Sequence, residues 1–157
     1  MRISRVTLSL VALSVAGLGL TVAAQQKPAA AAAPKVTVYK TSSCGCCRLW
    51  VDYMKRNGFD VQAMDVSSAD VRAVSKAAGL KDDDTSCHTA KIGNYVVEGH
   101  VPADDIKRML KEKPAIAGLS APGMPQGSPG MEQGSKEPYD VVAFTKDGRT
   151  TVFAKHK

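Results

Sequence analysis

The sequence predicts an α/β fold, because segments with strand-like and helix-like patterns alternate along the chain and turn signals separate them. The alternation begins at Lys35, after an N-terminal stretch of different composition. Roughly 120 residues follow that stretch, which is enough for one domain with its own hydrophobic core. The cysteines are therefore not needed to stabilise a small fold through disulfides.

The first half of the predicted domain has the order βαβα. Residues 35–39 alternate β-branched and polar types, as a strand does, and run directly into a cysteine-rich turn. From Cys47 to Asn57, apolar residues recur at helical spacing, so the cysteines open a helix that ends at Asn57 and Gly58. A second strand is predicted over 59–66 and a second helix over 68–78.

The second half predicts a hairpin, a helix and a further hairpin. Gly93 and Asn94 separate strands at 89–92 and 95–98 and favour the positive φ angles of a tight turn. A helix over 102–111 begins with proline and acidic residues and ends with lysine. Residues 115–134 form a predicted loop rich in Gly, Pro and Met, and a C-terminal β-hairpin follows over 139–153. The order over 35–113 resembles the thioredoxin-like fold, to which the loop and the last hairpin are appended.

The first 24 residues are typical of a secretory signal peptide. Arg2 and Arg5 precede an apolar run from Val6 to Leu20, and small residues end at Ala24. This run is shorter than the about 20 apolar residues that span a bilayer, although an uncleaved anchor is the alternative. We expect residues 25–34 to be a disordered linker, residues 35–157 to be a single domain, and the protein to be periplasmic, without membrane contact after cleavage.

The charge pattern argues against nucleic-acid binding. The formal charge of +6 falls to +4 without Arg2 and Arg5, and Lys and Arg are scattered among Asp and Glu. Aromatic residues make up only 5% of the chain and do not interleave with basic runs. We therefore expect no nucleic-acid partner.

Three of the four cysteines lie within four residues at the predicted junction of strand and helix. A helix N-terminus stabilises thiolates through its dipole and its free N–H groups. Cys44 and Cys47 have the Cys-x-x-Cys spacing of redox proteins, and Cys46 adds a sulfur that a disulfide exchanger does not need. The pattern predicts a thiolate-rich site.

The fourth cysteine is followed directly by a histidine, as Cys87-His88. In a thioredoxin-like topology this segment faces the N-terminus of the first helix, so four thiolates and one imidazole are expected to converge. Sulfur ligands favour copper(I), zinc or iron–sulfur clusters. Structural zinc sites usually combine two separated cysteine pairs, whereas neighbouring thiolates such as those of Cys46 and Cys47 can bridge two or more copper(I) ions.

Two structural disulfides are the alternative interpretation of four cysteines in an exported protein. They explain the compartment but not the crowding of the sulfurs. A Cys46–Cys47 bridge would be strained, and a Cys44–Cys47 bridge closes too small a loop to restrain the unfolded chain much.

Several roles remain open for other side chains that can bind metal or act in acid–base chemistry. His100 is a candidate metal ligand, proton partner of a thiolate, or cap of the following helix. Met124 and Met131 lie in the Gly/Pro loop, where thioether binding to copper(I) competes with gap filling. His156, near the end of the chain, is expected to be solvated.

Several short segments carry a closer resemblance: Thr41–Val51, Ser86–Thr89, Val97–Pro102, Gly118–Pro125, Gly127–Met131 and Pro138–Val141. Together they resemble the CopG-type copper-resistance proteins over residues 35–154, a family long catalogued as a domain of unknown function. The resemblance implies export, a thioredoxin-like core and copper binding by the cysteines.

The predicted function is copper(I) binding in copper tolerance, with Cys44, Cys46, Cys47, Cys87 and His88 as ligands of one or several ions. Other periplasmic copper-handling proteins are the expected partners. Thiolates can reduce copper(II) as they oxidise to disulfides, so catalytic turnover is left open. A periplasmic thiol-disulfide oxidoreductase is the alternative function.

Overall fold

The computed structural model describes residues 32–157, which form one compact unit. The predicted signal peptide (1–24) and most of the predicted linker (25–34) lie outside the described residues. Between residues 32 and 157, no helix combines the length and the apolar character that crossing a membrane requires.

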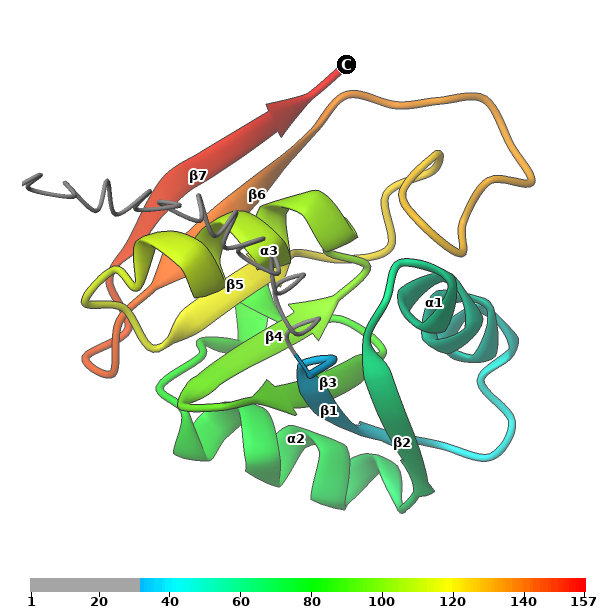
Figure 1. Ribbon diagram of the computed structural model, residues 1–157, viewed down its shortest axis with the longest axis horizontal. Coiled ribbons are helices and arrows are strands. Elements are labelled where there is room, and N and C mark those ends of the chain that lie inside the picture. The colour runs from blue at the N-terminus through cyan, green and yellow to red at the C-terminus, as the bar shows by residue number, and fades with distance from the viewer. Residues whose placement is uncertain (1–31) are drawn as a thin grey trace, which may run out of the picture. The chain divides into compact units, whose positions relative to one another are not determined.

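A seven-stranded sheet in the order β2-β1-β3-β4-β5-β6-β7 runs through the described chain (Figure 1). β1 pairs in parallel with β2, β4 pairs in parallel with β5, and the other neighbours are antiparallel. The strands are β1 (Lys35–Lys40), β2 (Asp60–Asp65), β3 (His88–Ile92), β4 (Tyr95–Gly99), β5 (Gly118–Ala121), β6 (Tyr139–Phe144) and β7 (Thr150–His156).

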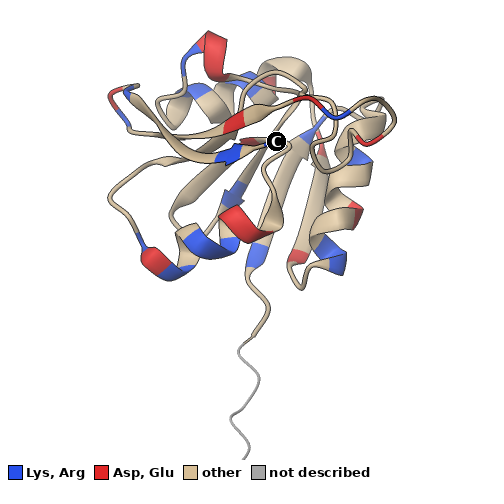
Figure 2. Cartoon of the chain, turned by 90° about the horizontal axis from the view of Figure 1, so that it is seen from above, with Lys and Arg blue, Asp and Glu red and all other residues tan. Residues whose placement is uncertain are grey.

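The helices cover both faces of this sheet. α1 (Gly45–Arg56) and α3 (Ala103–Glu112) share the larger core, where Trp50, Met54 and Ile106 are fully buried. Figure 1 shows α2 (Ser68–Ala77) on the opposite side from α3, and a short 3-10 helix, η1 (Asp82–Asp84), precedes β3. Basic and acidic residues are interspersed along these helices and the turns between them (Figure 2).

The predicted α/β class is confirmed, and the predicted helices and strands lie within a few residues of the observed ones. The prediction of one continuous loop over 115–134 is wrong, because it contains β5, whose four residues are all buried between β4 and β6. β5 joins the C-terminal hairpin, β6 and β7, to the same sheet. Gly118 permits this pairing, since a Cβ there would lie 1.8 Å from the carbonyl oxygen of Val96.

Candidate metal centre

The cysteine-rich turn connects the end of β1 to the start of α1. Cys44 is the N-cap of α1, and its Sγ accepts a hydrogen bond from the backbone N–H of Cys47 at 3.3 Å. The first turn of α1 contains no acidic residue. The positive end of the helix dipole therefore acts on the sulfurs without a neighbouring carboxylate to offset it.

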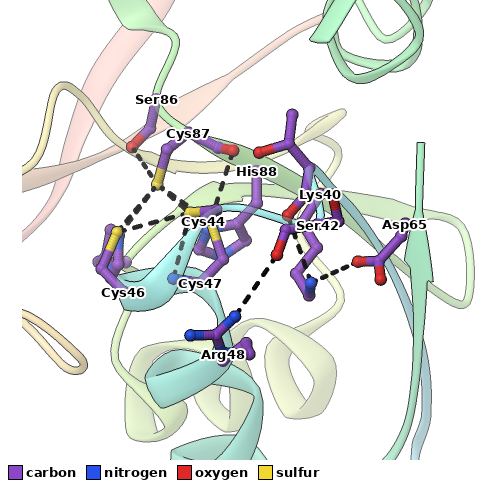
Figure 3. The surroundings of a disulfide bond; sticks show 12 residues. Lys40, Ser42, Cys44, Cys46, Cys47, Arg48, Asp65, Ser86, Cys87 and His88 are labelled. Atoms are coloured by element: carbon purple, nitrogen blue, oxygen red, sulfur yellow. Dashed lines mark hydrogen bonds and ion pairs between the residues drawn. A yellow bond between two sulfur atoms is a disulfide. The ribbon is translucent and has the colours of Figure 1, made fainter. Parts of the chain in front are cut away.

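The four sulfurs converge, as the sequence predicts. Cys46 Sγ lies 3.6 Å from Cys44 Sγ and 3.8 Å from Cys87 Sγ, and Cys87 Sγ lies 3.6 Å from Cys47 Sγ. Figure 3 shows Cys87 reaching from the start of β3 toward the three cysteines at the start of α1. All four Sγ atoms lie within 4.8 Å of one another, so one small ion can contact several of them.

Two of these cysteines are joined covalently. Cys44 and Cys47 form a disulfide, and Cys46 and Cys87 are free thiols. Because a thiolate, and not a disulfide sulfur, is the metal ligand, a four-thiolate site exists only when this bridge is reduced.

His88 lies beside the Cys87 sulfur. Its side chain is fully buried, its Nδ1 is 3.5 Å from Cys87 Sγ, and its ring centroid is 4.6 Å from that of Trp50. Burial lowers the pKa of His88 to about 3, and the nearby His100 and Lys40 act in the same direction. The ring is therefore neutral at physiological pH, and its Nε2 has no hydrogen-bond partner within the described chain. Nδ1 is the ring nitrogen that lies beside Cys87 Sγ, so it is the candidate ligand atom.

His100 contacts the same sulfur from the end of β4. Its Nε2 lies 3.2 Å from Cys87 Sγ, and its Nδ1 lies 2.8 Å from the carbonyl oxygen of Pro129. Burial lowers the pKa of His100, which favours the neutral ring. Of the roles left open by the sequence, capping of the following helix is wrong, because the N-cap of α3 is Pro102 and no side chain caps it. Cys87, His88 and His100 instead form a second group of donors within 4.8 Å of one another.

The Cys87 thiol is protonated in the absence of a cation. Burial raises the pKa of Cys87 to about 12, and the nearby Cys46 side chain acts in the same direction. Its S–H can donate to the unprotonated nitrogen of His100. A soft cation would replace this proton.

Glu98 is a buried residue that the sequence does not mark as part of the site. Its carboxylate accepts hydrogen bonds from the backbone N–H of Ser86 at 2.7 Å and from Thr89 Oγ1 at 2.6 Å, which brace the chain on both sides of Cys87-His88. Burial raises the pKa of Glu98 to about 7.

The loop between β5 and β6 lies beside the start of α1 (Figure 1). Gly123 N–H donates to the carbonyl oxygen of Thr85 at 3.0 Å, and Ser86 Oγ donates to the carbonyl oxygen of Gly123. Met124 is 53% exposed, so gap filling does not describe it, whereas Met131 is half-buried.

The expectation that His156 is solvated is wrong. His156 is half-buried, its Nε2 lies 2.7 Å from Asp105 Oδ2, and its ring stacks on Tyr139 with the centroids 4.8 Å apart. β7 extends past the predicted end of the hairpin and carries this side chain onto α3.

Two solved structures titled copper resistance protein CopG, Form 1 and Form 2, are similar to this chain, each at 40% sequence identity and a TM-score of 0.72. The Form 1 match covers 78% of this chain and 98% of the other, and the Form 2 match covers 80% and 99%. The family model described as "Protein of unknown function, DUF411" matches residues 85–131, which include Cys87, His88 and His100. No curated protein sequence matches the chain. At this identity and coverage, the chain belongs to the family of the copper resistance protein CopG.

Proposed function

We propose that this protein binds copper(I) in the periplasm and acts in copper tolerance. Cys44, Cys46, Cys47 and Cys87 are the thiolate ligands, and His88 is an imidazole ligand. The convergence of the four sulfurs carries this proposal: apart from the disulfide-bonded pair Cys44 and Cys47, neighbouring sulfurs lie 3.6 to 3.8 Å apart. Two thiolates bound to one ion at about 2.3 Å and a tetrahedral angle are themselves about 3.8 Å apart. The spacing of the sulfurs therefore suits a shared ion.

The donor set favours copper(I) over zinc. Thiolates are soft ligands, and family membership supports a copper-related function. Cys87 belongs both to the group of four sulfurs and to the group with His88 and His100. A thiolate shared in this way bridges ions, which supports a site for more than one copper(I). We add His100 to the proposed ligands, because its Nε2 lies 3.2 Å from the shared sulfur.

The fold that holds the site is proposed to be thioredoxin-like over its first four strands. The order β2-β1-β3-β4, with β1 and β2 parallel and β3 antiparallel to both of its neighbours, supports this assignment. In this arrangement, the start of β3 lies beside the end of β1, from which α1 begins.

The Cys44–Cys47 disulfide favours a second function, thiol-disulfide exchange, alone or coupled to copper. In the coupled reaction, the Cys44 and Cys47 thiolates each give one electron to one copper(II). The products are one disulfide and two copper(I) ions. In the uncoupled reaction, the same dithiol reduces a disulfide of another molecule and no metal takes part.

Replacing the middle cysteine separates these functions. In the reduced protein under anaerobic conditions, Cys46→Ser should weaken copper(I) binding by about 100-fold in competition with a copper(I) chelator, because it removes a bridging thiolate. Disulfide exchange by Cys44 and Cys47 should persist in this variant. Met64→Ser, which removes an exposed sulfur on β2, is the matched control and should bind as wild type does.

A Cys46→Ser protein that holds as many copper(I) ions as tightly as wild type would contradict the thiolate cluster. Retained reduction of a disulfide substrate together with unchanged metal binding would instead support the uncoupled oxidoreductase.

A further inference from the structure

We infer that the loop segment 125–132 positions His100, and that the Pro129 carbonyl fixes which nitrogen of this ring faces Cys87. This inference rests on the proposed function, because it assigns a role to a ring that faces the bound ion. It adds two positioning residues, Pro129 and Gly130, neither of which carries a metal-binding side chain.

The hydrogen bonds of His100 determine its tautomer. Nδ1 lies 2.8 Å from the carbonyl oxygen of Pro129, which can only accept a hydrogen bond, so Nδ1 carries the proton. In the neutral ring, Nε2 then has a free lone pair, directed at Cys87 Sγ at 3.2 Å. Metal-binding histidines commonly donate their second nitrogen to a carbonyl in this way, which fixes both the tautomer and the orientation of the ring.

Gly130 allows the Pro129 carbonyl to reach His100. Its φ is +87°, and a Cβ there would lie 2.9 Å from both the Cys46 carbonyl oxygen and the Trp50 backbone nitrogen. The same Cβ would lie 3.4 Å from His100 Nδ1. Two of these three atoms belong to the backbone of α1, which cannot turn aside as a flexible side chain can. Any side chain at this position therefore lifts the loop away from the ring.

The loop holds its own shape without help from the histidine. The backbone N–H of Gly130 donates to Glu132 Oε2 at 2.8 Å, and that of Met131 donates to the carbonyl oxygen of Ser128 at 2.8 Å. The buried Ser128 hydroxyl donates to the carbonyl oxygen of Pro125 at 2.6 Å. The direction of the Pro129 carbonyl is thus set before any ion binds, and His100 is preorganised in the metal-free protein.

Gly130→Ala tests the inference, and Gly123→Ala is its matched control. Both glycines lie in the same loop at positive φ, +87° and +71°, but a Cβ at Gly123 meets nothing within 4 Å. The two variants thus share the backbone strain and differ in contact with the site. Nitrogen-15 NMR of histidine-labelled, reduced, metal-free protein reports the protonated nitrogen of His100. Wild type and Gly123→Ala should show the proton on Nδ1, and Gly130→Ala should show a mixture.

Copper(I) affinity provides the second measurement. Gly130→Ala should bind about tenfold more weakly in chelator competition, the usual effect of losing a partner that orients a ligand. Gly123→Ala should change the affinity less than about threefold. Glu132→Ala removes an exposed side chain and leaves the Gly130 N–H without its acceptor. It should therefore change the tautomer and the affinity in the same direction as Gly130→Ala does, without unfolding the protein. Glu132→Gln keeps an acceptor and should show the wild-type tautomer and affinity.

A proton on Nε2 of His100 in the wild type would overturn the inference. So would an unchanged tautomer and affinity in both Gly130→Ala and Glu132→Ala. If the wild type binds no copper(I) while His100 still shows the expected tautomer, the proposed function fails and the positioning of the ring by the loop stands.

Discussion

The sulfur side and the imidazole side of the proposed site lie in different environments. On the sulfur side, Cys44, Cys46 and Cys87 are half-buried and Cys47 is fully buried, whereas both imidazoles, His88 and His100, are fully buried. Two of the sulfurs are already joined as a disulfide. The rings are neutral and are held by Trp50 and the Pro129 carbonyl. The partly exposed side can thus change its covalent state and its ions, while the buried side keeps one geometry.

Cys87 is the residue that the two sides share. Its sulfur lies 3.8 Å from Cys46 Sγ and 3.2 Å from His100 Nε2. This position predicts that the two sides are unequal in their contribution to binding and that the shared sulfur contributes most.

The largest effect is therefore expected for Cys87→Ser. Losing the shared thiolate disconnects the imidazoles from the other sulfurs, so copper(I) affinity should fall by more than about 100-fold in the reduced protein. Chelator competition measures the affinity, and far-ultraviolet circular dichroism checks the fold. If Cys46→Ser weakens copper(I) binding more than Cys87→Ser does, the shared position of Cys87 does not determine the affinity.

A smaller loss of affinity is expected for His88→Ala. The ring contributes one terminal bond, whereas each sulfur can bridge, so the expected loss lies below the loss of about 100-fold expected for a bridging cysteine. Because burial lowers the pKa of His88 to about 3, this difference should persist from pH 8 down to pH 5. The comparison between the two sides would be reversed if His88→Ala lost more affinity than Cys87→Ser across this range of pH.

Most elements of the fold were predictable because their patterns are local. Alternating strands, helical spacing and the Gly93-Asn94 turn each lie within a dozen residues or fewer. β5 was missed because Gly118–Ala121 is too short to show a period and has only one large apolar residue. β5 forms a strand because it pairs with β4, which is distant in sequence, and with β6, which follows a long loop.

In the candidate site, too, the local features were predictable and the features that depend on long-range contacts were not. The cysteines and His88 were identified by residue type and spacing, and the sulfurs converge as predicted. His100 stayed open because its contacts depend on how β4 and the loop at Pro129 meet. Glu98 was not recognised because alternation in a strand marks one inward face, whereas helices cover both faces of this sheet. Thr89, its hydrogen-bond partner, also contacts the carbonyl oxygen of Val71 on α2.

The smallest effect on metal binding is expected for Glu98→Gln, which acts on stability instead. Glu98 holds the backbone around Cys87-His88 through Ser86 and Thr89 but does not itself belong to either group of donors. Burial raises its pKa from 4.5 to about 7, so the folded state retains a proton that the unfolded state releases. The stability that this proton provides is fully present below about pH 4.5 and is lost as the pH rises through about 7.

Between pH 5 and pH 8, the free energy of unfolding of the wild type should therefore fall relative to Glu98→Gln, by on the order of 2 kcal/mol. His88 contributes the opposite slope, since its lowered pKa makes the folded state more stable as the pH rises toward 6.5. This contribution is common to both proteins and cancels in the difference.

Urea denaturation at several pH values measures the difference in the free energy of unfolding, and chelator competition should find copper(I) affinity changed less than about threefold. Parallel pH profiles for the two proteins would mean that Glu98 is ionised throughout. A large loss of copper(I) affinity would instead place Glu98 among the groups that support the sulfur side, because only a shift of Ser86 and Cys87 connects it to the ion.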